Sequence, residues 1–240
     1  MKKLEKLIEK IMPVDRFLIT VFAFMFNSLV YSGAREIAGG WKHHLLVSAV
    51  DKNIPFIPES LIIYFGCYIF GVWNYVLIAK LDKERAYRFY FADFFSRVIC
   101  FAIFLLFPTT NIRPEITGSG FWEQGMRFLY YIDKADNLFP SIHCLISWFC
   151  YIGIRKVDAV PKWYQRFSCV FAVLVFVSTL TTKQHVIWDV AGGVLLAEMT
   201  FFIANHTNTY LYYENLWRKV TQVLFGKKGK QHERCEKECM

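Results

Sequence analysis

Lys183, His185 and Asp189 lie between two apolar runs and carry the side chains best suited to chemistry. If a helix begins at His185, the spacing of four residues places Asp189 on the same face, one turn away. The carboxylate could then accept a hydrogen bond from one imidazole nitrogen and leave the other aimed at a reacting atom. Taken alone, this spacing is more often structural than catalytic, so its interpretation depends on the other polar clusters.

A second cluster is Pro140-Ser141-Ile142-His143, which opens another apolar segment. Ser141 offers a hydroxyl donor at a predicted helix N-terminus, where backbone N–H groups attract anions. A serine in this position is also a common helix cap. His143 could protonate a leaving oxygen and afterwards deprotonate a water molecule.

The third cluster is Arg113-Pro114, within the longest polar stretch, residues 108–140. A planar guanidinium matches the oxygens of a phosphate, and Lys183 adds a second fixed cation. Combined with an attacking His185, these groups predict nucleophilic and acid–base catalysis on a phosphate, with no metal and no cofactor.

The composition is that of a membrane protein: 55% of the 240 residues are hydrophobic and 18% are aromatic, in long runs. We therefore expect an all-α integral membrane protein, a six-helix transmembrane bundle. An amphipathic N-terminal helix in residues 1–15 precedes the membrane domain, residues 16–205, and a charged tail, residues 206–240, follows it. The expected spans are 17–34, 61–79, 89–107, 141–154, 167–182 and 185–204.

The cations predict the orientation of this bundle. Twenty Lys and Arg residues fall in the N-terminal head, the 80–88 turn, the 155–166 turn and the tail, and seven fall in the other loops and turns. The positive-inside rule then places both termini in the cytoplasm and residues 108–140, with His185, on the extracytoplasmic face. The formal net charge of +8 resides in short segments between apolar runs, which disfavours nucleic acid as a partner.

Other polar residues receive more ordinary interpretations. Asp93 and Arg97, four residues apart in a predicted span, are expected to form an intrahelical ion pair near the membrane boundary. Gly192-Gly193 should let a neighbouring helix approach closely. The acidic loop residues are expected to be solvated rather than ligands, and two asparagines are near enough to the motifs to line a pocket. These are Glu115, Glu123, Asp133 and Asp136, and Asn111 and Asn137.

The order Arg-Pro, Pro-Ser-x-His and His-x3-Asp resembles the type 2 phosphatidic acid phosphatase (PAP2) superfamily of integral membrane lipid phosphatases. The resemblance covers roughly residues 50–205. It implies His143 as general acid, His185 as phosphohistidine-forming nucleophile, Asp189 as its orienting carboxylate, and Arg113 and Ser141 as phosphate ligands. The implied substrate is a lipid phosphate, of the phosphatidic acid or polyprenyl diphosphate type.

Two positions depart from the superfamily pattern. Leu106 stands where a Lys is usual, and Thr179 stands where an Arg is usual, so Lys183 is the natural substitute cation. This variant is more similar to the branch that includes inositol phosphorylceramide synthases, which transfer the phosphoryl group to an alcohol. The acceptor, water or an alcohol, is therefore left open.

Two rival hypotheses remain. His143, His185 and Asp189 could form a metal site with two histidines and one carboxylate, but neighbouring cations disfavour a divalent metal. Alternatively, Asp93, Arg97, His143 and Asp189 could be intramembrane groups of a small transporter. Discontinuous helices and inverted halves would support a transporter, and the sequence shows neither. The sequence leaves the oligomeric state open.

Overall fold

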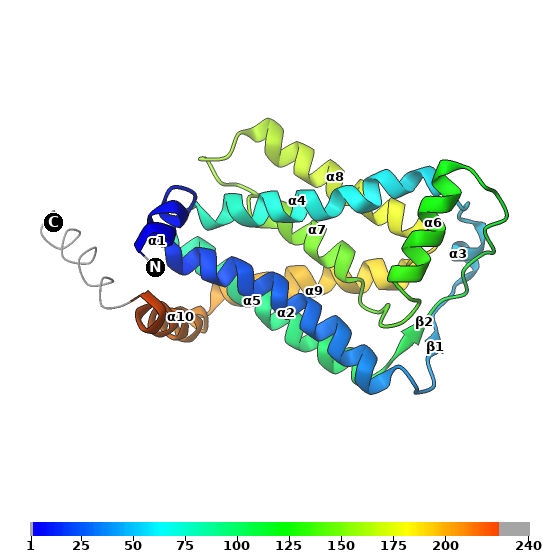
Figure 1. Ribbon diagram of the computed structural model, residues 1–240, viewed down its shortest axis with the longest axis horizontal. Coiled ribbons are helices and arrows are strands. Elements are labelled where there is room, and N and C mark those ends of the chain that lie inside the picture. The colour runs from blue at the N-terminus through cyan, green and yellow to red at the C-terminus, as the bar shows by residue number, and fades with distance from the viewer. Residues whose placement is uncertain (1, 226–240) are drawn as a thin grey trace, which may run out of the picture.

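The computed structural model describes residues 2–225, in which long helices run roughly side by side (Figure 1). Five helices are long and apolar enough to cross a membrane by length and composition. Their starts follow local rules: Pro13 and Pro161 precede two of them, and the Asp82 side chain caps a third by accepting from the Arg85 N–H at 2.9 Å. The five are α2 (Val14–Ala38), α4 (Leu61–Ala79), α5 (Lys83–Leu106), α8 (Lys162–Thr181) and α9 (Ile187–His206).

The sixth expected span is the short helix α7 (Ile142–Ile152). Its 11 residues rise about 16 Å at 1.5 Å per residue, roughly half the hydrocarbon thickness of a bilayer. It packs against α4, α8 and α9. The number of complete spans therefore stays a prediction, because α7 lies inside the bundle but is too short to cross a bilayer by itself.

The remaining elements gather at the two ends of the bundle (Figure 1). At one end lie α1 (Lys2–Glu9) and α10 (Tyr210–Phe225). At the other end, α6 (Phe121–Ile132) lies across the bundle, near α3 (Ala49–Asn53) and the 3-10 turn η1 (Pro58–Ser60). Two strands of two residues each, β1 (His44–Leu45) and β2 (Thr109–Thr110), pair in parallel beside them.

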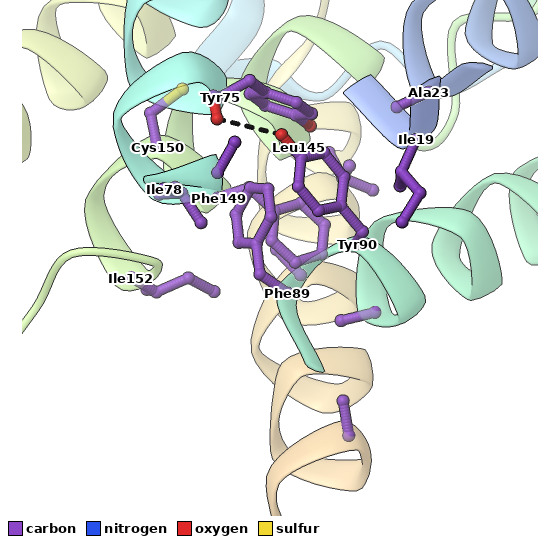
Figure 2. Close-up of a cluster of buried hydrophobic side chains, with 14 of the residues drawn as sticks. Ile19, Ala23, Tyr75, Ile78, Phe89, Tyr90, Leu145, Phe149, Cys150 and Ile152 are labelled. Atoms are coloured by element: carbon purple, nitrogen blue, oxygen red, sulfur yellow. Dashed lines mark hydrogen bonds between the residues drawn. The ribbon is translucent and has the colours of Figure 1, made fainter. Parts of the chain in front are cut away.

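An aromatic core joins α4, α5 and α7 (Figure 2). Tyr75, Phe89 and Phe149 meet edge to face, with ring centroids 5.0 Å apart for Tyr75–Phe89 and 5.7 Å for Phe89–Phe149. The Tyr90 hydroxyl donates to the carbonyl of Tyr75 at 2.9 Å and pairs with the Thr20 hydroxyl at 2.6 Å, which ties α2 to the same core. The core therefore holds α7 firmly despite its length.

The Asp93–Arg97 ion pair forms as predicted, with an Arg97 nitrogen 2.8 Å from the Asp93 carboxylate. Its place near the membrane boundary stays a prediction. Both side chains are only 1–2% exposed and lie in the middle of α5, where the Tyr75 hydroxyl also donates to Asp93 at 2.7 Å. Charges this deep require partners. Here the two charges on α5 pair with each other, and α4 supplies the tyrosine hydroxyl.

The segment expected as a charged tail begins with a packed helix. Tyr213 and Trp217 of α10 are buried, and the Trp217 ring lies 5.1 Å from that of Phe22 on α2. The Tyr213 ring lies 5.4 Å from that of Phe94 on α5. The charged residues 226–240 lie outside the described part of the chain.

Candidate active site

The ends of α7 and α9 that carry the second and third motifs are held in close contact. A Cβ on Gly193 would lie 2.6 Å from the Ser141 carbonyl oxygen and 3.2 Å from the Leu145 nitrogen, so only glycine fits. In addition, the Ser141 N–H donates to the Asp189 carbonyl at 3.0 Å. The backbone thus fixes the two motifs relative to each other, as the double glycine predicted.

His185 lies before α9 rather than in it, so the expectation of a helix beginning at His185 is wrong. The helix begins at Ile187, and Asp189 in its first turn folds back over the N-terminus. One Asp189 carboxylate oxygen accepts the Val186 N–H at 3.0 Å and lies 3.2 Å from Nδ1 of His185. The Nε2 atom of His185 takes no part in this hydrogen bond, as the spacing predicted. The two side chains meet because Asp189 caps the helix, and not because both lie on one helical face.

The turn that presents His185 depends on Lys183. Its φ of 56° lies in the left-handed region, and the N–H groups of Gln184 and His185 both donate to the Thr179 carbonyl, at 3.0 and 3.1 Å. The Tyr130 hydroxyl donates to the carbonyl of the preceding Thr182 at 2.8 Å. The turn is therefore anchored from α6 as well as from α8.

The two motif histidines face each other. Their ring centroids are 5.8 Å apart, close enough for one phosphoryl group to contact both. His143 Nε2 lies 3.1 Å from the Tyr68 hydroxyl, and its ring packs 4.6 Å from that of Tyr64.

Both histidines line a cavity of about 400 Å³ bounded by α2, α4, α7 and the segment after α6. One part of its wall is apolar, and the other carries hydroxyl, amide and carboxylate groups. Apolar contacts come from Phe24, Cys67, Val72, Leu138, Ile142 and Ile146, and polar groups from Asn27, Ser28, Tyr31, Ser32, Tyr68, Asp133, Asp136, Asn137 and Gln184.

The three predicted phosphate ligands do not belong to the described wall of this cavity. The fully buried Ser141 hydroxyl caps α7 by accepting from the Cys144 N–H at 3.3 Å. The Lys183 ammonium donates to the carbonyls of Asp51 and Ile54, at 3.1 and 2.5 Å. Their roles on a phosphate stay predictions.

Arg113 is hydrogen-bonded to a residue of the cavity wall. Its guanidinium donates to the Asp133 carbonyl at 2.7 Å and to the side-chain oxygen of Gln184, and it lies 4.5 Å over the Tyr130 ring. Burial lowers the pKa of Arg113, and the nearby Asp133 opposes this. Gln184 lines the cavity, so Arg113 is connected to the cavity wall through its hydrogen bond to Gln184.

Asp133 and Asp136 were expected to be solvated loop charges, and this is wrong. The Asp136 carboxylate is 14% exposed and receives Arg35 through both Nε, at 2.9 Å, and an NH2 nitrogen, at 2.8 Å. Asp133 accepts from the hydroxyls of Tyr31, at 2.6 Å, and Tyr64, at 2.9 Å. Their partners come from α2 and α4, distant in sequence, which is why no local pattern predicted them.

The two positions that depart from the superfamily pattern hold no cation. Leu106 is 84% exposed at the end of α5, and Thr179 is fully buried in α8 with its hydroxyl on the Phe176 carbonyl at 2.8 Å. Sequence reasoning also missed Tyr64 and Tyr68. The one signal for them is their spacing of four residues on α4, in a run that is otherwise apolar from Leu61 to Trp73.

Outside the cavity, Asp51 ties the loop before α4 to the motif. Its carboxylate accepts the Ile187 N–H at 2.8 Å and pairs with Ser48 at both the hydroxyl, 2.5 Å, and the N–H, 2.8 Å. Burial opposes the charge, but these hydrogen bonds and nearby Lys183 lower the pKa of Asp51 below 3.8.

Comparison with protein families matches residues 40–203 to the PAP2 superfamily. The chain belongs to the PAP2 superfamily. The match spans all six predicted site residues and confirms the resemblance stated from the motifs. Comparisons with curated proteins and with solved structures found no match. PAP2 membership and five apolar helices fit a multi-pass membrane protein with phosphoesterase-type chemistry on a lipid phosphate.

The described part of the PAP2 chain, residues 2–225, contains no group of three His, Cys, Asp or Glu side chains placed to hold a metal ion. Asp189 lies behind His185 on Nδ1, and so does not converge with the two imidazoles on a shared point. This geometry is typical of an oriented imidazole, as in nucleophile–base–orienter arrangements.

Proposed function

We propose that this PAP2 protein is a membrane lipid phosphatase that hydrolyses a lipid phosphomonoester or diphosphate through a phosphohistidine. One observation carries the proposal: His143 and His185 face each other across 5.8 Å at a largely apolar cavity, with Asp189 on the far nitrogen of His185. An amphiphilic substrate suits such a cavity, because its chain can lie on the apolar wall while its phosphate reaches the imidazoles.

In the first step, Nε2 of His185 attacks phosphorus. The N–P bond forms as the bond to the lipid oxygen breaks, and His143 gives its proton to that oxygen. Asp189 stabilises the positive charge that develops on His185. In the second step, His143 takes a proton from water, the hydroxide oxygen attacks phosphorus, and the P–N bond breaks to release phosphate and restore His185.

Arg113, Ser141 and Lys183 are proposed to hold the phosphate oxygens. This requires Arg113 to exchange Gln184 for the phosphate, and Lys183 to leave the loop carbonyls. Catalytic hydrogen bonds often form only in the substrate complex, so the present contacts are compatible with that exchange. The site is proposed to face the extracytoplasmic side with both termini in the cytoplasm, as the Lys and Arg distribution predicts.

A phosphotransferase similar to inositol phosphorylceramide synthases is the second candidate. The observation that favours it is the polar part of the cavity wall, where Asn27, Ser28 and Ser32 of α2 could hold the hydroxyls of an alcohol. An alcohol bound there would replace water in the second step, and its oxygen would take the phosphoryl group as the P–N bond breaks, which leaves a phosphate monoester of the alcohol.

The test uses purified full-length chain with a panel of lipid phosphates, with and without inositol, and measures both free phosphate and newly formed inositol phosphate. We expect His185→Ala to abolish turnover and to lose an acid-labile, base-stable phosphoryl label that the wild type acquires. His206→Ala is the matched control, because His206 is exposed at the far end of α9. Wild-type turnover by the His185 variant would refute the assignment.

A further inference from the structure

The Asp133 carboxylate lies in the wall of the cavity that holds both histidines, and its place is built by two other helices. Tyr31 of α2 donates to one carboxylate oxygen at 2.6 Å, and Tyr64 of α4 donates to the other at 2.9 Å. Among the described residues, Asp133 forms no ion pair with a lysine or arginine side chain, since Arg113 binds its main-chain carbonyl instead. This is an anion placed beside the site of an anionic substrate.

Tyr64 connects this carboxylate to His143. The Tyr64 side chain is fully buried; its hydroxyl donates to Asp133 while its ring lies 4.6 Å from the imidazole. The Asp133 carboxylate, the Tyr64 phenol and the His143 imidazole therefore lie in contact one after another. The Tyr68 hydroxyl lies 3.1 Å from Nε2 of His143.

Other charged or titratable groups also face this region. Asp136 is matched by the bidentate Arg35, so the pair adds little net charge. The His185 ring lies 5.8 Å from that of His143, centroid to centroid. The remaining groups near His143 are Tyr31, Cys67 and, through Gln184, Arg113.

The charge on Asp133 interacts with the imidazole of His143. Burial opposes the charge on Asp133, but His143, the two tyrosine hydrogen bonds and His185 outweigh it and lower the pKa of Asp133 below 3.8. The same attraction must favour the charged form of His143, because an interaction between two groups is reciprocal. Burial lowers the pKa of His143 to about 4, Asp133 opposes this, and His185 lowers the pKa further.

We propose that Asp133, held by Tyr31 and Tyr64, is a positioning residue that favours the protonated form of His143 in the substrate complex, where His143 gives its proton to the leaving oxygen. The proposal rests on the proposed function, in which His143 is the general acid. It explains why an anion is tolerated here: the positive charge of the imidazolium balances the carboxylate, so the pair adds no net repulsion toward the substrate phosphate.

The test measures the pH dependence of kcat and kcat/KM for Asp133→Asn, using a lipid phosphate that the wild type hydrolyses. Loss of the carboxylate should move the alkaline limb to lower pH by about one unit, which is about tenfold in rate above the limb. An aryl phosphate with an acidic phenol needs no protonation, so its turnover should fall much less. Asp133→Glu should restore the limb.

Glu115→Gln is the control, because Glu115 is an exposed carboxylate in the same polar stretch and lies outside the described wall of the cavity, so its alkaline limb should stay in place. An Asp133→Asn variant with an unmoved limb and equal losses on both substrates would overturn the proposal. Should that variant fail to fold, histidine-selective NMR of the wild type with orthovanadate bound decides instead. A neutral His143 at the pH of maximal turnover would overturn the proposal, and a protonated one would support it. If the wild type releases no phosphate from any lipid, the proposed function itself fails.

Discussion

Lys183→Met separates two roles for this lysine, a phosphate ligand and a tether for the turn that carries His185. The ammonium donates to the carbonyls of Asp51 and Ile54, and the residue is only partly exposed. A hydrogen bond from a charged donor contributes about 1.5–3 kcal/mol, and the lower end applies to a partly hydrated ammonium. Because both bonds come from one ammonium, their contributions are less than additive, and their joint loss should cost about 2–3 kcal/mol, while Met keeps most of the apolar stem.

In a chain of this size, that loss corresponds to a decrease in Tm of roughly 4–12 °C. The assay compares Tm, lipid phosphate turnover and vanadate inhibition in the same detergent. If Lys183 acts as a tether, the Lys183→Met variant should have a lower Tm. Its turnover should also be slower, because the turn that carries His185 is held less firmly. Lys52→Met, which removes an exposed lysine of the same loop, should leave Tm unchanged.

The left-handed φ of Lys183 supplies a second control. Lys183→Gly loses the same two bonds but relieves a strained backbone conformation, so it should be about 1 kcal/mol more stable than Lys183→Ala. A Lys183→Met variant with wild-type Tm and strongly weakened vanadate inhibition would refute the tether and favour direct phosphate contact.

Two further predictions concern the backbone that positions the motifs. Gly193→Ala forces a methyl group to within 2.6 Å of the Ser141 carbonyl, so we expect a cost of about 1–3 kcal/mol and a large loss of kcat, both measurable in detergent. Asp51→Asn keeps an acceptor for the Ile187 N–H, but its amide nitrogen cannot accept from Ser48. The variant should therefore lose about 1–2 kcal/mol in the free energy of unfolding, measured as a decrease in Tm. Because the folded pKa of Asp51 is lowered, its contribution is present above about pH 4 and lost as pH falls through the lowered value, so wild type and variant should converge in acid. A Gly193→Ala variant as active as wild type, or an Asp51→Asn deficit that persists unchanged in strong acid, would contradict these expectations.

The sequence by itself determined the helices, the membrane class and the hydrogen-bonded pair of His185 and Asp189. Apolar runs bounded by prolines and charged turns specify helices through local physics, and their positions agree with α2, α4, α5, α8 and α9 to within a few residues. The spacing from His185 to Asp189 predicted their hydrogen bond correctly, because four residues bring the two side chains together both in a helix and in a capped turn.

Tertiary structure alone decided what surrounds that pair. Asp133 and Asp136 lie in a polar stretch and look solvated in sequence, but tyrosine and arginine side chains from α2 and α4 bury them at the cavity. Lys183 looked free beside His185, but the left-handed turn directs its ammonium to the loop before α4. These contacts join residues 69 to 132 positions apart in sequence, so no periodicity or motif carries them. They follow from how the helices pack, and that packing brings a carboxylate to the imidazole of the second motif.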